Sequence, residues 1–436
     1  MNHQVSDALA ALKKIGSVRA LEASKPAGAG GGPEGGAGPI KPGNSHIHLP
    51  PNFSAFQNIE QVISLARQEH LRYLGASNYY DFAVYGDFAR RAQAAGIFPI
   101  FGTEIICLLP DLRQQLVKIN DPGNPGKMYL CGKSITRFSP LTPGGQAILE
   151  EIRQNDSTRM QAMIERLAAY CVRHGIPSGL DEAGVVQMIV RRHGCPRNSV
   201  YLQERHVAQA LQEALWSRIP TGDRAAKLAT LFGAPSKAKG LWDAADAVTV
   251  QNEIRTYLMK TNKPGFVEET FIGFAKARRL VLELGGIPCY PILADGTTPI
   301  CQFEDPVEQL IARIKELGVF ATELVPGRNA PEVLTRYAKA LRAAGLVVTA
   351  GTEHNTLDLV PMTPSCKGGI PIPAELQAIF WEGACVLAAQ QFLNVHGQTG
   401  YLDAQGILNP AYATDEARIE KLAHLGAAVI AKYTGR

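Results

Sequence analysis

Two hydrophobic patterns alternate along most of the chain. In the first, apolar residues recur every three or four positions, which predicts an amphipathic helix; in the second, a short unbroken apolar run predicts a buried strand. The predicted strands are residues 44–49, 73–76, 97–106, 287–293, 319–325 and 346–350. The predicted helices beside them are residues 58–69, a helix that ends at Ala95, and residues 268–284, 306–317 and 331–344.

Repeated strand–helix units joined by tight glycine turns imply parallel strands that are buried on both faces. The pattern therefore predicts an α/β protein with a closed or nearly closed barrel, whose functional groups lie at the carboxyl ends of the strands. Residues 145–262 interrupt this alternation, because they show helical periodicity and hardly any strand signal. We expect a helical insertion domain there, carried on one loop of the barrel.

The two ends of the chain complete the expected organisation. Residues 7–22 have the spacing of a short amphipathic helix, and the glycine-rich tract 27–39 loses too much backbone entropy to pack, which predicts a flexible tether. Residues 373–395 and 414–433 are predicted helices that close the barrel. In sequence order, the expected parts are a helix and tether at 1–43, the first part of the barrel at 44–144, the insertion domain at 145–262, and the second part of the barrel with its closing helices at 263–436.

Composition narrows the class of protein. With 436 residues, 46% of them hydrophobic and 19% charged, the chain suits a large barrel or two domains and has the balance of a soluble globular protein. The net charge of +4 comes without a dense basic run, so nothing indicates nucleic acid, and no apolar stretch approaches the roughly 20 residues that cross a bilayer. The eight cysteines form no Cys-x-x-Cys pair, and the first residues lack a signal-peptide layout. We expect a reduced, cytoplasmic protein, with assembly into homo-oligomers left open.

Two histidines one residue apart, His46 and His48, stand at the end of the first predicted strand. Side chains two positions apart on a strand point the same way, so their imidazoles would lie side by side. Imidazole is a common ligand of zinc, manganese and iron, although two histidines can also share a strand edge by chance. The polar residues at the ends of later strands are the run 77–81, Glu104, Tyr290, Glu323 with Arg328, and Glu353 with His354. Because these strand ends meet at one mouth, the pattern predicts a metal site there.

The order of these motifs resembles that of the PHP (polymerase and histidinol phosphatase) domain. The matching features are His-x-His, a polar tripeptide after a short strand, Gly-x-Glu-Ile, and a late Gly-Thr-acid-His. Residues 204–211 and 284–288 are similar to the helical insertion, and to the return into the barrel, of the family's nucleotide and small-molecule phosphatases. The resemblance spans roughly residues 44–360 and implies a distorted (β/α)7-like barrel with a multi-metal phosphoesterase site.

Three tyrosines stand where this resemblance leads one to expect histidines. They are Tyr79 in Ser-Asn-Tyr, Tyr129 before Leu-Cys-Gly, and Tyr290 in Cys-Tyr-Pro. A tyrosine can ligate a metal, hydrogen-bond a substrate, act as an acid or base, or fill the space of a lost ligand. The late motif reads Glu353-His354-Asn355, so either Glu353 keeps the register or His354 supplies the ligand. The resemblance therefore implies a reduced site that holds one or two divalent ions of zinc, manganese or iron.

The residues and the resemblance together assign provisional roles. The expected metal ligands are His46, His48 and Glu104, completed by Glu353 or His354. The expected substrate-binding residues are Asn78, Tyr129, Arg205, His206 and Arg328, and the expected catalytic residues are Tyr79, Tyr290 and Glu353. Guanidinium groups suit a phosphate or carboxylate, so we expect a small anionic substrate. Three functions stay open: a metal-dependent hydrolase, a metal-dependent lyase or isomerase acting on a sugar or sugar acid with a tyrosine as proton carrier, and a catalytically silent binding module.

Overall fold

The computed structural model describes residues 3–23, 42–138, 140–240 and 244–435. The chain forms two compact units. The first unit is drawn from Met1–Leu49, Asn58–Leu149 and Ile272–Arg436, and the second from Pro50–Gln57 and Glu150–Phe271. The glycine-rich tract for which a flexible tether was predicted lies outside the described residues.

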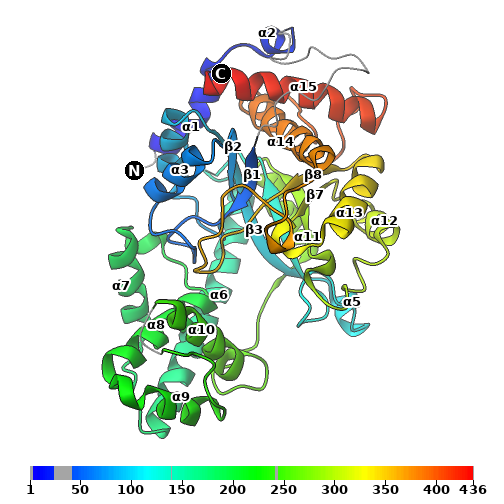
Figure 1. The fold of residues 1–436 in the computed structure, drawn as a ribbon. Helices are drawn as coiled ribbons and strands as arrows, with labels where there is room; N and C mark the ends of the chain where they lie inside the picture. Colours follow the sequence, from blue (N-terminus) through cyan, green and yellow to red (C-terminus); the bar gives the residue numbers. More distant parts are fainter. Residues whose placement is uncertain (1–2, 24–41, 139, 241–243, 436) are drawn as a thin grey trace. The chain divides into compact units, whose positions relative to one another are not determined.

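A single sheet forms the centre of the first unit (Figure 1). Its strands are β1 (Gly43–Ile47), β2 (Tyr73–Ala76), β3 (Phe98–Leu108), β4 (Lys127–Lys133), β5 (Ile272–Gly273), β6 (Ile287–Ile292), β7 (Ala321–Leu324) and β8 (Val347–Ala350). They pair in the order β1-β2-β3-β4-β6-β7-β8, and the short β5 pairs with β3. Ile47 forms a parallel bridge with Glu353, which follows β8, so the sheet is nearly closed on itself. The predicted α/β barrel is confirmed.

One strand departs from the prediction that all strands are parallel. β4 runs antiparallel to both of its neighbours, β3 and β6. The connection from β3 to β4 contains only the short helix α5 (Pro110–Gln114), and a chain that returns without a crossover helix must pair antiparallel. Only the five-residue α5 precedes this strand, and not an amphipathic helix of the strand–helix pattern, so the sequence pattern did not reveal β4.

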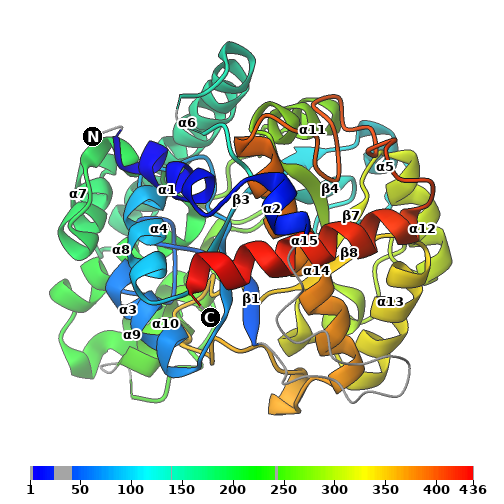
Figure 2. The same cartoon turned by 90° about the horizontal axis from the view of Figure 1, so that it is seen from above.

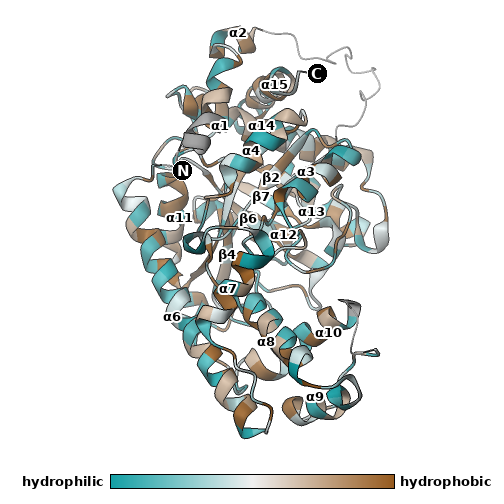
Figure 3. Ribbon diagram, turned by 90° about the vertical axis from the view of Figure 1, so that its left-hand side faces the viewer, coloured by the Kyte–Doolittle hydropathy of each residue, from teal (hydrophilic) through white to brown (hydrophobic). Residues whose placement is uncertain are grey.

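Helices surround the sheet of the first unit. Those that follow the barrel strands are α3 (Ile59–Gln68), α4 (Tyr85–Ala94), α11 (Phe274–Glu283), α12 (Val307–Glu316) and α13 (Pro331–Ala343). Several are amphipathic, with polar and apolar segments visible in Figure 3, and turn their apolar residues to the sheet. All of them coincide with predicted helices, although α11 begins at Phe274, six residues after the start of the predicted helix 268–284.

The two C-terminal helices, α14 (Ala374–Val395) and α15 (Asp415–Thr434), cover one end of the barrel. Phe98, Ile287 and Val347, which lie at the starts of three strands, share one hydrophobic core with these helices. Figure 2 shows α15 crossing this end of the sheet. The N-terminal helices α1 (His3–Lys14) and α2 (Val18–Glu22) add Leu12 and Leu21 to the same core. With this end covered, the carboxyl ends of the parallel strands open on the opposite side.

The second unit is helical. Besides the later part of α6 (Pro143–Arg173), it contains α7 (Glu182–His193), α8 (Glu204–Arg218), α9 (Arg224–Phe232) and α10 (Ala244–Ile254), which a π-helical turn extends through Arg255–Met259. Leu167, Ile189, Leu211 and Ile254 meet in its own hydrophobic core. No strand occurs among the residues described for this unit. None of the helices in the described parts of the chain combines the length and the apolar character needed to cross a bilayer.

Candidate metal centre

Three of the predicted metal ligands meet inside the barrel. His46 lies on β1, His48 follows it directly, and Glu104 lies on β3. Nε2 of His46 and Nε2 of His48 are each 3.3 Å from Oε2 of Glu104 and 3.4 Å from each other. The exposed fractions of the three residues are only 1%, 0% and 5%. Three potential donor atoms therefore converge at one buried point.

These distances can be tested against the size of a metal ion. Three atoms 3.3–3.4 Å apart form a nearly equilateral triangle, whose centre lies about 1.9 Å from each corner. A point slightly above this plane is about 2.0–2.2 Å from all three atoms, which is the range for zinc bound to nitrogen and carboxylate oxygen. Two imidazoles and one carboxylate are also a ligand set of catalytic zinc sites, which keep a further position open. The donors fit one divalent ion.

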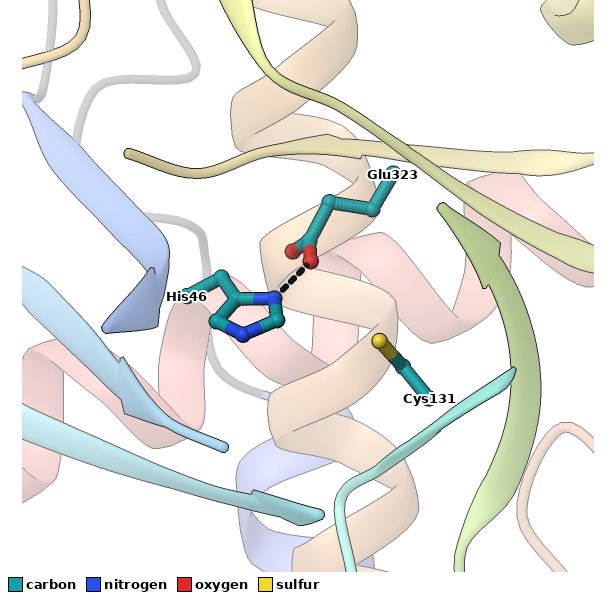
Figure 4. Close-up of side chains that lie close together, drawn as sticks. All are labelled: His46, Cys131 and Glu323. Atoms are coloured by element: carbon teal, nitrogen blue, oxygen red, sulfur yellow. Dashed lines mark hydrogen bonds and ion pairs between the residues drawn. The ribbon is translucent and has the colours of Figure 1, made fainter. Parts of the chain in front are cut away.

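Glu323 fixes the orientation of His46, as Figure 4 shows. Oε1 of this carboxylate lies 2.6 Å from Nδ1 of His46, and because a carboxylate only accepts hydrogen bonds, Nδ1 must carry the hydrogen. In the neutral ring, the lone pair then resides on Nε2, the atom that faces Glu104 and His48. A carboxylate that holds the second nitrogen of a ligand histidine is a recurring support of metal sites.

A lysine occupies the interior beside Glu323. Lys133 on β4 is fully buried, and its Nζ lies 2.8 Å from Oε1 of Glu323. It also donates to the carbonyl oxygen of Ser45 at 3.0 Å and to Oγ of Ser77 at 3.1 Å. An ammonium has three hydrogens, and each has an acceptor here. The buried charge is thus both paired and fully hydrogen-bonded, which is the condition for tolerating it in a core.

The electrostatics of the cluster favour a bound cation. Burial and the Lys133 ammonium lower the pKa of His46, but the carboxylates of Glu323 and Glu104 outweigh them and raise it to about 9. Burial alone would raise the pKa of Glu104, yet its hydrogen bonds and charge interactions with His46 and His48 keep it well below the usual range. Burial likewise opposes ionisation of Glu323, but Lys133 and His46 lower its pKa to about 2. A proton therefore resides among the donors until a metal ion displaces it.

Tyr79 supports the carboxylate ligand. Its hydroxyl donates to Oε1 of Glu104 at 2.5 Å, and its ring stacks on His48 with the centroids 5.2 Å apart. Although the residue is partly exposed, desolvation of the hydroxyl and the nearby Glu104 charge raise the pKa of Tyr79 well above its usual range. The phenol therefore stays protonated at neutral pH and acts as a donor. Tyr129 is also partly exposed and lies close enough for its charge to affect Tyr79.

Glu353 and His354 do not join the cluster. Among the described residues, the groups of ligand atoms that lie within 4.8 Å of one another include neither of them. The Glu353 carboxylate instead pairs with Arg328 and accepts from Asn355 at 2.9 Å. Nε2 of His354 donates to a backbone carbonyl at 2.9 Å, and its Nδ1 lies 2.6 Å from the Thr352 hydroxyl, so both ring nitrogens are engaged. These contacts therefore do not support the predicted role of Glu353 or His354 as a metal ligand.

The backbone around Glu353 brings the chain after β8 against β1. Glu353 and His354 both have positive φ, 64° and 50°, a conformation that costs energy in residues other than glycine and is found at functional sites. A side chain at Gly351 would meet Cβ of His46 at 2.4 Å, so only glycine permits this approach. The approach lets the amide of Glu353 donate to the carbonyl oxygen of His46 at 2.9 Å.

Two further predicted site residues have structural contacts. The side-chain amide of Asn78 accepts from the Leu49 amide at 2.7 Å and donates to the Leu49 carbonyl at 2.9 Å, which fixes the chain just after His48. Tyr290 is fully buried, and its hydroxyl donates to Glu304 at 3.0 Å rather than to any donor of the cluster. The catalytic role expected for Tyr290 thus has no support in these contacts.

The predicted anion-binding residues fall in both units. Arg328 is in the first unit, with its side chain 38% exposed and paired with Glu353. Arg205 and His206 are at the start of α8 in the second unit, where the Arg205 guanidinium lies over the Phe53 ring. Burial is the main cause that lowers the pKa of His206 to about 3, so its imidazole is neutral. Their roles in substrate binding stay predictions.

Sequence reasoning missed two residues of this centre. Glu323 was noted only as a polar strand end, and Lys133 was not considered. One pattern in the sequence pointed to Lys133. Every second side chain of a strand lies on the same face, and here that face carries Lys127, Tyr129, Cys131 and Lys133. Alternation alone does not tell whether that face is turned inward, and the strand itself was not predicted.

Comparisons with known proteins add a similarity in fold only. No protein-family model matches the sequence, and no curated protein matches it. A solved structure from Bifidobacterium adolescentis, of a protein named as a metal-dependent phosphoesterase, has 16% identity and a TM-score of 0.49, covering 80% of this chain and 98% of its own. An amidohydrolase from Chromobacterium violaceum, solved with sulfate and without metal, has 17% identity and a TM-score of 0.48, covering 77% of this chain and 96% of its own. At this level of similarity, neither protein transfers an activity or a ligand to this chain.

Proposed function

We propose that this protein is a metal-dependent hydrolase that acts on a small phosphorylated or otherwise anionic metabolite. The observation that carries the proposal is the triangle of Nε2 of His46, Nε2 of His48 and Oε2 of Glu104, with sides of 3.3–3.4 Å. A bound divalent ion supplies Lewis acidity and activates water near neutral pH, which is the usual basis of hydrolysis at such sites. Zinc, manganese and iron all suit nitrogen and carboxylate donors.

The residues around the donors support a catalytic rather than a purely structural site. Structural zinc sites are closed by four protein ligands, whereas among the described residues three donors converge here, so a bound ion would keep a coordination position for water or substrate. Glu323 holds the proton on Nδ1 of His46, and Tyr79 holds Glu104, so the donors are fixed before a ligand arrives. Such preorganisation is what a catalytic centre needs.

The anionic character of the substrate is inferred from Arg328. Its guanidinium belongs to the loop after β7, at the mouth of the barrel, and is partly exposed beside Glu353. An incoming phosphate or carboxylate can compete with Glu353 for the guanidinium and form two parallel hydrogen bonds with it. Tyr79 and Tyr129, both partly exposed, are candidates to contact the substrate next to Glu104.

The proposal is tested by metal content and hydrolysis measured on the same preparations. Metal analysis by mass spectrometry is expected to find a divalent ion in the wild type, and phosphate release is expected from members of a phosphomonoester panel. Both should fall to background in a His46→Ala/His48→Ala variant and persist in His424→Ala, a change in helix α15. Bound metal without any hydrolysis would favour a lyase or isomerase, and a wild type without metal would favour a silent binding module.

A further inference from the structure

A second group of ligand-type side chains adjoins the metal centre. Donor atoms of His46, Cys131 and Glu323 all lie within 4.8 Å of one another, and the three residues are buried (Figure 4). Cys131 is the register partner of Glu104 on the neighbouring strand, so both side chains project from the same face of the sheet. By residue type alone, an imidazole, a thiol and a carboxylate would suit a second metal ion.

The positive charge beside these three residues is the ammonium group of Lys133. The three hydrogens of the Lys133 ammonium are directed to Glu323 at 2.8 Å, the Ser45 carbonyl at 3.0 Å and the Ser77 hydroxyl at 3.1 Å. Glu323 is equally occupied: its Oε1 accepts from Lys133 and His46, and its Oε2 accepts from the Ser45 hydroxyl at 2.5 Å. Neither oxygen of Glu323 is left without a hydrogen-bond donor.

We propose that the Lys133 ammonium stands permanently in the place of a second metal ion, so that the protein binds one divalent ion and no more at this centre. The inference rests on the proposed function, because it presumes that His46, His48 and Glu104 bind the first ion. A second divalent ion would have to displace Lys133 from Glu323 and would then face its positive charge at short range in a medium of low dielectric constant.

A tethered cation also has a consequence for His46. Because Lys133 cannot dissociate, Glu323 remains ionised and keeps its hydrogen bond to Nδ1 of His46 at every metal concentration. Lys133 is thus a positioning residue, which acts on the first ion through Glu323 and His46 rather than by contact. A two-metal centre would lose this orientation whenever its second ion left.

The number of bound ions tests the inference. The full-length protein, stripped with a chelator, is titrated with Co²⁺, and bound cobalt is counted per chain while the near-ultraviolet absorption is recorded, since coordination by a thiolate adds a charge-transfer band. The matched control is Lys127→Ala, which removes another buried lysine of β4, one paired with Asp121 at 3.2 Å. Cys131→Ser in the Lys133→Ala background identifies the source of any thiolate band.

We expect one cobalt per chain and no thiolate band in the wild type and in Lys127→Ala. In Lys133→Ala the count should rise to two, with a thiolate band that disappears when Cys131→Ser is added. Two ions at the wild-type centre, or a single ion without a thiolate band in Lys133→Ala, would overturn the inference and leave the proposed function standing. A wild type that binds no ion would overturn both. The wild-type count decides the question even if the variant does not fold.

Discussion

Removing the hydroxyl of Tyr79 should weaken metal binding by an amount that can be calculated. This hydroxyl lies 2.5 Å from Oε1 of Glu104, and Oε2 of the same carboxylate faces the two histidines. Changing Tyr79→Phe keeps the ring that stacks on His48 and deletes only this hydrogen bond. The Glu104 carboxylate then loses the hydrogen bond to its Oε1 and is held less firmly, so that binding an ion must order it further.

The expected magnitude follows from the geometry. A hydrogen bond to a charged group contributes about 1.5–3 kcal/mol, and removing a group that supports a metal ligand commonly weakens metal binding by about 10–100-fold. A 10–100-fold change equals about 1.4–2.8 kcal/mol, so the two scales agree. We therefore expect the dissociation constant for the divalent ion to rise by about 10–100-fold in Tyr79→Phe.

The assay is a zinc titration in chelator-buffered solutions, read by competition with a chromophoric chelator. Tyr290→Phe is the matched control, because it also deletes a tyrosine hydroxyl that donates to a glutamate, in this case Glu304 at 3.0 Å. Its dissociation constant should stay within a factor of two or so of the wild type. Equal affinities for the wild type and Tyr79→Phe would refute the assignment of Tyr79 as the support of Glu104.

Three further predictions concern the barrel and its mouth. A side chain at Gly426 would meet the Cys385 carbonyl oxygen at 1.7 Å, so Gly426→Ala should lower the unfolding free energy by about 3 kcal/mol, whereas Gly273→Ala, with nothing within 4 Å, should change it little in the same urea titration. Burial raises the pKa of Glu304 from 4.5 to about 7, so the folded state binds more protons than the unfolded state and stability falls between these pH values. Glu304→Gln should therefore gain stability relative to the wild type, by at most about 3 kcal/mol, as the pH rises from 4.5 to above 7; a pH-independent difference contradicts this. Arg328→Ala should raise KM for an anionic substrate without changing the metal content, and an unchanged KM would exclude it from substrate binding.

Most of the fold could be predicted from the sequence because its hydrophobic patterns are local. Each βα unit carries a strand run and an amphipathic helix side by side, and α13 was predicted as residues 331–344 against Pro331–Ala343 in the structure. The antiparallel β4 is separated from β3 only by the short α5, and its orientation depends on the strands with which it pairs across the sheet. That information lies in contacts with β3 and β6, outside any local window.

The site was predictable only in part, for the same reason. His46 and His48 were recognised by their spacing and Glu104 by the Gly-x-Glu-Ile motif, although Glu104 lies inside β3 rather than at its end. The sequence did not separate the roles of Glu323 and Glu353, because both stand near the carboxyl end of a barrel strand, Glu323 within β7 and Glu353 after β8. The structure separates them: the Glu323 side chain hydrogen-bonds to His46, whereas the Glu353 side chain pairs with Arg328.

The bond between His46 and Glu323 joins residues 277 positions apart, and this separation sets an order of events during synthesis. The three donors are all complete once residue 104 has been added, but the carboxylate that fixes the His46 proton is made much later. At roughly 5–20 residues per second, the ribosome needs roughly 11–44 s to extend the chain from Glu104 to Glu323. Through that interval the candidate ligand His46 lacks the carboxylate that orients its ring. If the proposed function is correct, we expect the metal ion to reach its final geometry only after residue 323 has been added.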